Sequence, residues 1–257
     1  MLLINVKAIV IIIIGLTILA LTAASPIIKA PNIDILNSET AYRTEETIGI
    51  PCTMIQDSRA AAYAEYIISE KEYKTFVCIT LGTGIGTGII INGKLYSGGL
   101  GNAGELGHTH IKGGTRQCGC GKSGCLEAYT AGKGLDKTAK ELLGGESTAR
   151  DLFEAAKNGS GKCREAINNA VELLANGISS LVNIISPEII VFSGGLINQT
   201  ELYIHPLFKK IKEYCYNTGT NTELKTAALG ENAPMVGAAL LPEIRKQDFE
   251  ISASIMC

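Results

Sequence analysis

The sequence lacks any excess of basic charge. Its 257 residues include 23 Lys and Arg against 25 Asp and Glu, giving a formal net charge of −2. Without a basic field nothing holds a nucleic-acid backbone electrostatically, so the composition disfavours DNA and RNA binding. Tryptophan is absent and aromatic residues make up 5% of the chain, whereas glycine is plentiful at 29 residues. That glycine content is typical of an enzyme with many tight turns and close backbone approaches.

Several common motifs are also missing. The glycine-rich turn LGTGIGTG at residues 81–88 is not followed by Gly-Lys-Ser or Gly-Lys-Thr, which excludes a Walker-type phosphate loop. The chain has no internal repeat, no low-complexity tail and no basic helix-turn-helix segment. Its length allows one large domain or two lobes with substantial cores.

The cysteines do not form the pattern of a disulfide framework. Of the eight, three cluster in CGCGKSGC and the other five are scattered along the chain. Reduced thiols with one metal site explain this distribution better. They indicate a reducing compartment and therefore predict a cytoplasmic protein.

The thiol cluster belongs to a longer metal-binding pattern. His108 is followed by Cys118, Cys120 and Cys125 on a glycine-rich loop, and one imidazole with three thiols is a tetrahedral set suited to zinc. A closed shell of four protein ligands implies a structural ion and not the activation of a water. His110 is the alternative imidazole, but we expect it to point outward and to take no part.

Acidic residues and glycines stand close to this loop. Asp57 follows an expected strand and precedes an expected helix, where α/β folds place catalytic carboxylates, although a helix N-cap is the simpler interpretation. Glu105 and Glu127 flank the metal loop and can accept hydrogen bonds from vicinal sugar hydroxyls. The successive glycines of residues 82–88 can hold phosphate oxygens on their N–H groups, but ordinary hairpins use the same residues.

Strands alternate with helices along the chain, which predicts an α/β fold. We expect strands at residues 48–55, 74–81, 89–91, 94–96, 189–195 and 224–229. We expect helices at residues 38–47, 58–71, 126–131, 134–143, 147–157, 162–185, 202–217 and 234–246. Asn92-Gly93 is a hairpin turn signal. In the helix at 58–71, Ala61, Ala64, Ile67 and Ile68 are spaced for one buried face.

Taken together, the order of these pieces resembles the ROK family (repressors, open reading frames, kinases), which includes bacterial glucokinases, fructokinases and N-acetylmannosamine kinases. The resemblance rests on the segments IPCTMIQDSRAAAYAE, ITLGTGIGTGIIINGKLYSGGLGNAGELGHTHIKGGTRQCGCGKSGCLEAYTAG, SPEIIVFSGGL and ALGENAPMVGAALL. It covers residues 29–242 and is most specific between Gly82 and Glu127. It implies the two-lobed, actin-like sugar kinase fold, with a ribonuclease-H-like sheet in each lobe.

Carried over residue by residue, the resemblance implies roles for the site. Asp57 would be the catalytic base that accepts the proton of a hexose hydroxyl. The sugar would be bound by Gln56, Glu105, His108 and Glu127. His108 would bind zinc through one ring nitrogen and the sugar through the other. The structural Zn²⁺ would thereby hold the loop in position against the sugar.

The same resemblance implies a nucleotide-binding site. ATP, accompanied by Mg²⁺, would lie with its phosphates on Gly82, Thr83, Gly84, Gly86 and Thr87. The adenosine would lie by Gly194 and Gly195. The relatives also imply a homodimer.

Two departures from the family pattern affect the functional hypothesis. Gln56 stands where the family usually has asparagine, so its amide is displaced by about one methylene and sugar specificity is affected. No Asp-x-Gly-Gly-Thr phosphate loop precedes Asp57. The leading hypothesis is an ATP-dependent hexose kinase similar to glucokinase. The alternatives are a catalytically impaired sugar-binding relative that lacks this loop and, less favoured, a transcriptional repressor.

The first residues of the chain allow three interpretations. Residues 8–28 carry no charge and can be a signal peptide, a membrane anchor or the buried first strands of a lobe. The strand interpretation is favoured, because secretion would separate a kinase from ATP, and no membrane partner is expected. We divide the chain into an apolar segment (1–25), a first-lobe remnant with Asp57 (26–72), a second lobe (73–246) and a tail (247–257).

Overall fold

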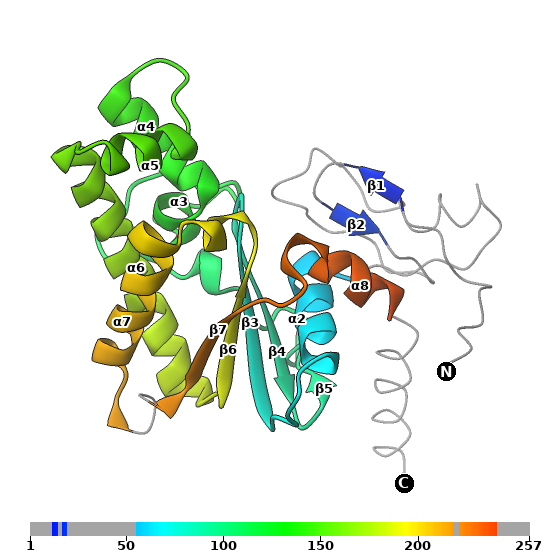
Figure 1. The fold of residues 1–257 in the computed structure, drawn as a ribbon. Helices are drawn as coiled ribbons and strands as arrows, with labels where there is room; N and C mark the ends of the chain where they lie inside the picture. Colours follow the sequence, from blue (N-terminus) through cyan, green and yellow to red (C-terminus); the bar gives the residue numbers. More distant parts are fainter. Residues whose placement is uncertain (1–11, 15–16, 20–54, 218–220, 241–257) are drawn as a thin grey trace, which may run out of the picture.

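The computed structural model describes residues 12–14, 17–19, 55–217 and 221–240 (Figure 1). The helix expected at residues 38–47, nearly all of the strand expected at 48–55, and the end of the helix expected at 234–246 lie outside these ranges. Within the apolar N-terminal run, β1 (Ile12–Ile14) and β2 (Thr17–Leu19) pair antiparallel. Among the helices that the structure describes, none combines the length and apolar character needed to cross a bilayer.

In the described part of the chain, the largest sheet has five strands in the order β5-β4-β3-β6-β7. Its strands are β3 (Thr75–Leu81), β4 (Ile85–Ile91), β5 (Lys94–Leu95), β6 (Ile189–Ser193) and β7 (Glu223–Thr226). β3, β4 and β5 form antiparallel hairpins, whereas β6 runs parallel to both β3 and β7. The carboxyl ends of β3 and β6 therefore meet at one edge of the sheet, where α/β folds place their ligands.

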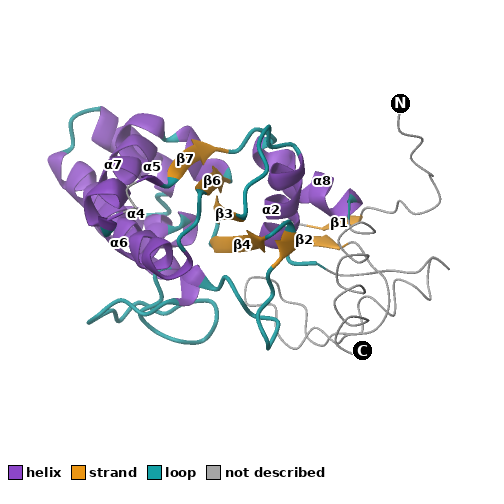
Figure 2. Cartoon of the chain, turned by 90° about the horizontal axis from the view of Figure 1, so that it is seen from below, coloured by secondary structure: helices purple, strands orange, loops and turns teal. Residues whose placement is uncertain are grey.

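Helices cover both faces of this sheet and produce three layers (Figure 2). One face carries α4 (Gly132–Leu143), α5 (Ala149–Lys157), α6 (Gly161–Ile185) and α7 (His205–Tyr214). The other carries α2 (Asp57–Ile67) and α8 (Ala233–Ala239). Side chains of β3 alternate between two cores: Val77 and Ile79 pack on the larger helical layer, and Phe76 and Cys78 pack on the α2 side. A strand covered on both faces needs the continuous apolar run that the sequence shows.

Most expected elements are confirmed within a few residues, including β3, β6, α4, α5 and α6. The hairpin signal is also confirmed, since Asn92 and Gly93 both have positive φ, at 51° and 77°. The strand expected at 89–91 was wrong at its start: β4 begins at Ile85, because residues 85–88 pair with β3 instead of forming a loop. Helix α7 is shorter than expected and follows a π-helical turn, Thr200–Ile204.

Helix α2 carries Asp57 and is buried from two sides in its first two turns. Ala60, Ala61, Ala62 and Ala64 are completely buried, because small side chains allow the backbone to lie close to both neighbours. The expected burial of Ile67 and Ile68 is wrong: they are 49% and 43% exposed, because α2 ends at Ile67 and does not continue to residue 71 as expected.

Glycines on the neighbouring elements make this close packing possible. A Cβ added to Gly86 would lie 2.5 Å from the Ser58 Cβ, and one added to Gly88 would lie 2.3 Å from the Ala62 Cβ. On the opposite side of α2, a Cβ added to Gly237 of α8 would lie 1.8 Å from the Ala60 carbonyl oxygen. These glycines of β4 and α8 fix the position of α2 and therefore the position of Asp57.

We expect Gly237→Ala to destabilise the protein by about 1–3 kcal/mol, the usual cost of overpacking a filled contact. The added methyl group displaces α8 from α2, since the atom it meets is rigid backbone. For a domain of this size, thermal denaturation should show a melting temperature lower by about 2–4 °C per kcal/mol. Gly161→Ala is the matched control, because nothing lies within 4 Å of its added Cβ. Equal melting temperatures for the two variants would contradict the packing described above.

Candidate functional site

The catalytic candidate, Asp57, is the first residue of α2 and does not precede the helix as expected. Gln56 is the N-cap, with an extended backbone (φ −63°, ψ 135°). The Ser58 N–H donates to Asp57 Oδ1 over 2.7 Å. Burial raises the pKa of the Asp57 carboxyl above its ordinary value, against the opposing effect of this hydrogen bond. A carboxyl group with a raised pKa is a better proton acceptor once it is ionised.

Gln56 connects the Asp57 side of the site with the metal loop. Its Nε2 donates to Glu105 Oε1 over 3.4 Å, and Glu105 Oε2 lies 3.8 Å from His108 Nε2. Glu105 is exposed and immediately precedes the short helix η1 (Leu106–His108). The structure thus brings together the predicted sugar-binding residues Gln56, Glu105 and His108.

His108 presents its two ring nitrogens to different partners. Nε2 faces Glu105, whereas Nδ1 lies 3.7 Å from Cys118 Sγ and 3.8 Å from Glu127 Oε1. One nitrogen therefore faces the thiols and the other faces the side where a sugar is expected. This is the arrangement in which a metal ion on Nδ1 would fix the tautomer that Nε2 presents.

The four predicted metal ligands converge. The ligand atoms of His108, Cys118, Cys120 and Cys125 all lie within 4.8 Å of one another, and Cys120 Sγ is 3.6 Å from Cys125 Sγ. Tetrahedral zinc with sulfur bonds of about 2.3 Å separates its ligand atoms by about 3.8 Å, so the donor set fits this ion in both chemistry and spacing. His110 is exposed and lies outside this group of four.

The surroundings of the thiols also favour a cation. Burial, the largest cause, raises the pKa of the Cys118 thiol, and the nearby Glu127 carboxylate acts in the same direction. The Cys118 thiol donates to Glu127 Oε1 over 3.2 Å. A thiolate here needs a positive partner at neutral pH, and a divalent ion supplies one.

Glu127 links the metal loop to the sheet. It is the first residue of α3 (Glu127–Thr130) and is 8% exposed. One carboxylate oxygen contacts Cys118 and His108, while Oε2 accepts the N–H of Ile85 over 3.0 Å. Ile85 is the first residue of β4, directly after the glycine turn. The metal loop and the expected phosphate turn therefore share one buried anchor.

The phosphate turn is shorter than the sequence suggested. Only residues 82–84 connect β3 to β4, and the Gly82 N–H donates to the Gly84 carbonyl over 3.1 Å. Gly86 and Thr87 lie inside β4, opposite Thr80 and Ile79 of β3. Thr87 is 1% exposed, which leaves it almost no surface for a phosphate. Gly82, Thr83 and Gly84 remain the accessible candidates.

Gly194 and Gly195 follow β6 at the same edge of the sheet. Gly194 has a φ of 89°, and its added Cβ would lie 2.5 Å from the Leu81 carbonyl oxygen at the end of β3. The Ser193 hydroxyl donates to the Gly230 carbonyl over 3.1 Å, which holds the segment before α8 against the end of β6. Gly195 is exposed and is free of such packing constraints.

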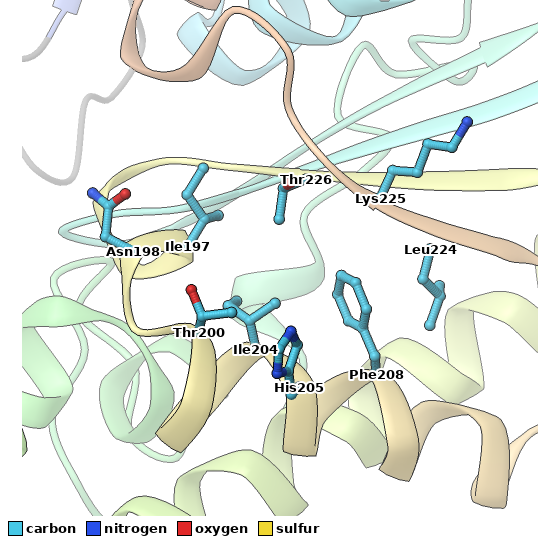
Figure 3. Close-up of a pocket in the computed structure, with 9 residues that line it drawn as sticks. All are labelled: Ile197, Asn198, Thr200, Ile204, His205, Phe208, Leu224, Lys225 and Thr226. Carbon is cyan, nitrogen blue, oxygen red and sulfur yellow. The ribbon is translucent and has the colours of Figure 1, made fainter. Parts of the chain in front are cut away.

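A pocket of about 630 Å³ lies between α7 and β7 (Figure 3). Ile204, Phe208 and Leu224 give it apolar walls, and His205 and Lys225 add polar groups. Sequence reasoning missed this pocket, because its walls come from segments that meet only in the folded chain. Two of the lining residues, Ile197 and Asn198, follow the Gly194-Gly195 pair in the chain, which was the one available signal.

Comparisons with known proteins place the chain among ROK proteins. The ROK family model matches residues 4–244. The glucokinase of Streptomyces coelicolor is 32% identical over 235 residues, which are 84% of this chain and 74% of that protein. An N-acetylmannosamine kinase of Escherichia coli is 33% identical over 196 residues, 76% of this chain and 66% of that protein.

Solved structures of ROK proteins superpose on this chain. A ROK glucokinase from Streptomyces griseus, in complex with glucose and AMPPNP, superposes with a TM-score of 0.74 at 30% identity, covering 84% of this chain and 76% of that one. A ROK family transcriptional regulator, a homologue of the E. coli MLC protein, superposes with a TM-score of 0.72 at 25% identity, covering 88% and 60%.

Proposed function

Since this chain belongs to the ROK family and has the actin-like fold of its sugar kinases, we propose that it phosphorylates a hexose with ATP, in the manner of glucokinase. The observation that carries the proposal is the continuous path Gln56–Glu105–His108 beside Asp57. This path would offer hydrogen-bonding groups to a polyhydroxy ligand, and it begins at Gln56, the chain neighbour of the proposed base.

Asp57 would accept the proton of the attacking sugar hydroxyl as its oxygen bonds to the γ-phosphorus. Its raised pKa suits this role, because a base works best when its pKa approaches the operating pH. Burial of α2 by β4 and α8 holds the carboxylate in place, so no reorganisation is needed during transfer. Mg²⁺ would enter with the nucleotide and neutralise phosphate charge.

Glu105 and His108 Nε2 are the most accessible candidates for binding sugar hydroxyls. Glu127 is more buried and both of its oxygens already have partners, but each carboxylate oxygen can accept a further hydrogen bond. We therefore assign Glu127 chiefly to holding the loop, and one of its oxygens would also accept a hydrogen bond from the sugar. Gln56 would add an amide on the Asp57 side.

Zn²⁺ would be held by His108, Cys118, Cys120 and Cys125 as a structural ion. When bound it would supply the positive charge that keeps the three thiols ionised. The loop between Gly113 and Gly124 contains many glycines, and the ion would limit its motion beside His108 and Glu127. The ion's role is thus positional.

The nucleotide would lie along the edge of the sheet where β3 and β6 end. Backbone N–H groups of residues 82–84 suit phosphate oxygens, and Gly195 allows close approach of a ribose. The pocket between α7 and β7, where Ile204, Phe208 and Leu224 stand among polar side chains, would receive the base (Figure 3). The homodimer and the cytoplasmic location stay predictions.

A sugar-responsive protein without turnover is the second candidate. The superposition on a ROK transcriptional regulator, which covers 88% of this chain, favours it. Such a protein would keep the path from Gln56 to His108 and need no phosphoryl donor.

Turnover separates the two candidates. We expect the purified full chain to form ADP from ATP and Mg²⁺ only when a sugar is present, tested with glucose, N-acetylmannosamine and N-acetylglucosamine in a coupled assay. Reactions without sugar and without Mg²⁺ are the controls. Thermal stabilisation by one of these sugars with no ADP formed would favour the second candidate. If none of these sugars causes ADP formation or thermal stabilisation, both candidate functions are excluded.

A further inference from the structure

Two of the four metal ligands are carried by a small hairpin that starts at Arg116. The Gly124 N–H donates to the Arg116 carbonyl over 2.9 Å, Gln117 and Ser123 form an isolated β-bridge, and the Cys118 N–H donates to the Lys122 carbonyl over 2.8 Å. Cys118 and Cys120 lie within this hairpin, which we call the ligand hairpin (residues 116–124). Its placement relative to His108 and Cys125 decides whether the four ligands meet.

Tyr129 on α3 holds the beginning of the ligand hairpin. Its phenol oxygen accepts the Thr115 N–H over 2.7 Å and the Arg116 N–H over 2.8 Å. The Tyr129 ring packs against the cluster formed by Cys118, Cys125 and Ala128. One side chain therefore contacts the ligand set with its ring and fixes the hairpin backbone with its hydroxyl.

Arg116 completes the attachment from the hairpin side. Its guanidinium carbon lies 4.9 Å from the centre of the Tyr129 ring, close enough for a cation–π contact. Its nitrogens donate to Thr138 Oγ1 over 2.9 Å and to Glu141 over 2.6 Å, both on α4. The ligand hairpin is thus tied to α3 and α4 by side chains that coordinate nothing.

This attachment has a consequence for the metal centre. Cys125 lies just before α3 and Glu127 is its first residue, so α3 already sets the position of one ligand and of the carboxylate beside His108. Tyr129 holds the hairpin that carries the other two thiols against the same helix. A hairpin held in this way loses less conformational entropy when an ion binds, and preorganisation of this kind raises affinity.

We propose that Tyr129 and Arg116 are positioning residues of the metal centre, which hold Cys118 and Cys120 at binding distance from His108 and Cys125. This inference rests on the proposed zinc-ordered sugar site. It adds that zinc affinity depends on a phenol oxygen and a guanidinium outside the coordination shell.

Tyr129→Phe is the sharpest test, because it removes the accepting oxygen and keeps the ring. In competition with a chromophoric chelator, we expect the full-length variant to bind zinc about 10–100-fold more weakly than wild type, the usual effect of losing an outer partner. At limiting zinc the KM for sugar should rise, and excess zinc should restore it with kcat unchanged. Tyr216→Phe is the matched control, since Tyr216 is 74% exposed and lies far from Tyr129 in the sequence.

Arg116→Lys provides a second variant should Tyr129→Phe fold poorly. It keeps the charge but loses the planar fork, so its zinc affinity should fall by a smaller factor. Wild-type zinc affinity in both variants would overturn this inference while leaving the proposed function intact. A wild-type chain that phosphorylates sugar but binds no zinc would overturn this inference together with the zinc assignment.

Discussion

Asp57→Asn is expected to lower kcat by about 10²–10⁴-fold, the usual contribution of a positioned general base. Asparagine keeps the shape and the hydrogen bond from Ser58 but cannot take the hydroxyl proton. Sugar binding should change little, because Gln56, Glu105 and His108 remain. Steady-state kinetics with saturating ATP and Mg²⁺ measures kcat, and isothermal titration measures sugar affinity. The control Asp151→Asn removes a surface carboxylate and retains a capping side chain, so its kcat should equal that of wild type.

The pH dependence provides an independent check on Asp57. Burial raises its pKa, and only the ionised form accepts a proton, so wild-type activity should fall on the acid side at a higher pH than an ordinary carboxyl would give. The residual activity of Asp57→Asn should lack this acid limb. Because the raised pKa disfavours the ionised form in the folded state, stability contributed by Asp57 is lost as pH rises through that pKa. The variant should therefore melt no lower than wild type at neutral pH. An active variant with an unchanged acid limb would rule out Asp57 as the base.

Removal of the metal is expected to have the second largest effect. Cys125→Ala should abolish stoichiometric zinc and lower kcat/KM for the sugar by on the order of 10²-fold, because misplacing binding groups by about 1 Å costs that much. Without the ion, His108 would lose the partner that orients its ring, and the hairpin that carries Cys118 and Cys120 would lose its link to His108. Elemental analysis of the purified protein gives the zinc content, and the coupled assay gives the kinetics.

Cys215→Ala is the matched control for metal removal. Cys215 is buried in the larger core and is a free thiol, so its loss should leave both the zinc content and the KM for sugar unchanged. Prolonged chelation of wild type should reproduce the Cys125→Ala kinetics. Full turnover by a chain free of metal would contradict the structural role assigned to the ion.

The local features of this fold could be predicted from sequence, because each depends on neighbours in the chain. The β-prone run at residues 74–81 identified the strand β3, Asn92-Gly93 identified a hairpin, and helical spacing identified α6. The metal ligands could also be found, since one continuous stretch contains all four. Their convergence in space is what the structure adds, together with the direction of each His108 nitrogen.

Other features depend on contacts between distant segments and could not be predicted. Gly86 was assigned to phosphate binding, but the structure shows it giving room to Ser58 of α2. The pocket beside Phe208 forms between α7 and β7, and no local pattern identifies such a junction. The Tyr129–Arg116 attachment was missed for the same reason, since a tyrosine in a short helix has no distinctive spacing.

The buried carboxylate of Glu127 couples the two ligand sites mechanically. Its bond to Ile85 joins the carbohydrate loop to the first residue of β4, directly after the phosphate turn. Helix α2 rests on Gly86 and Gly88 of the same strand, and the Arg59 guanidinium donates to the Gly101 and Ala103 carbonyls over 2.6 Å and 3.1 Å. A displacement of β4 would therefore be transmitted to the base and to the carbohydrate loop together.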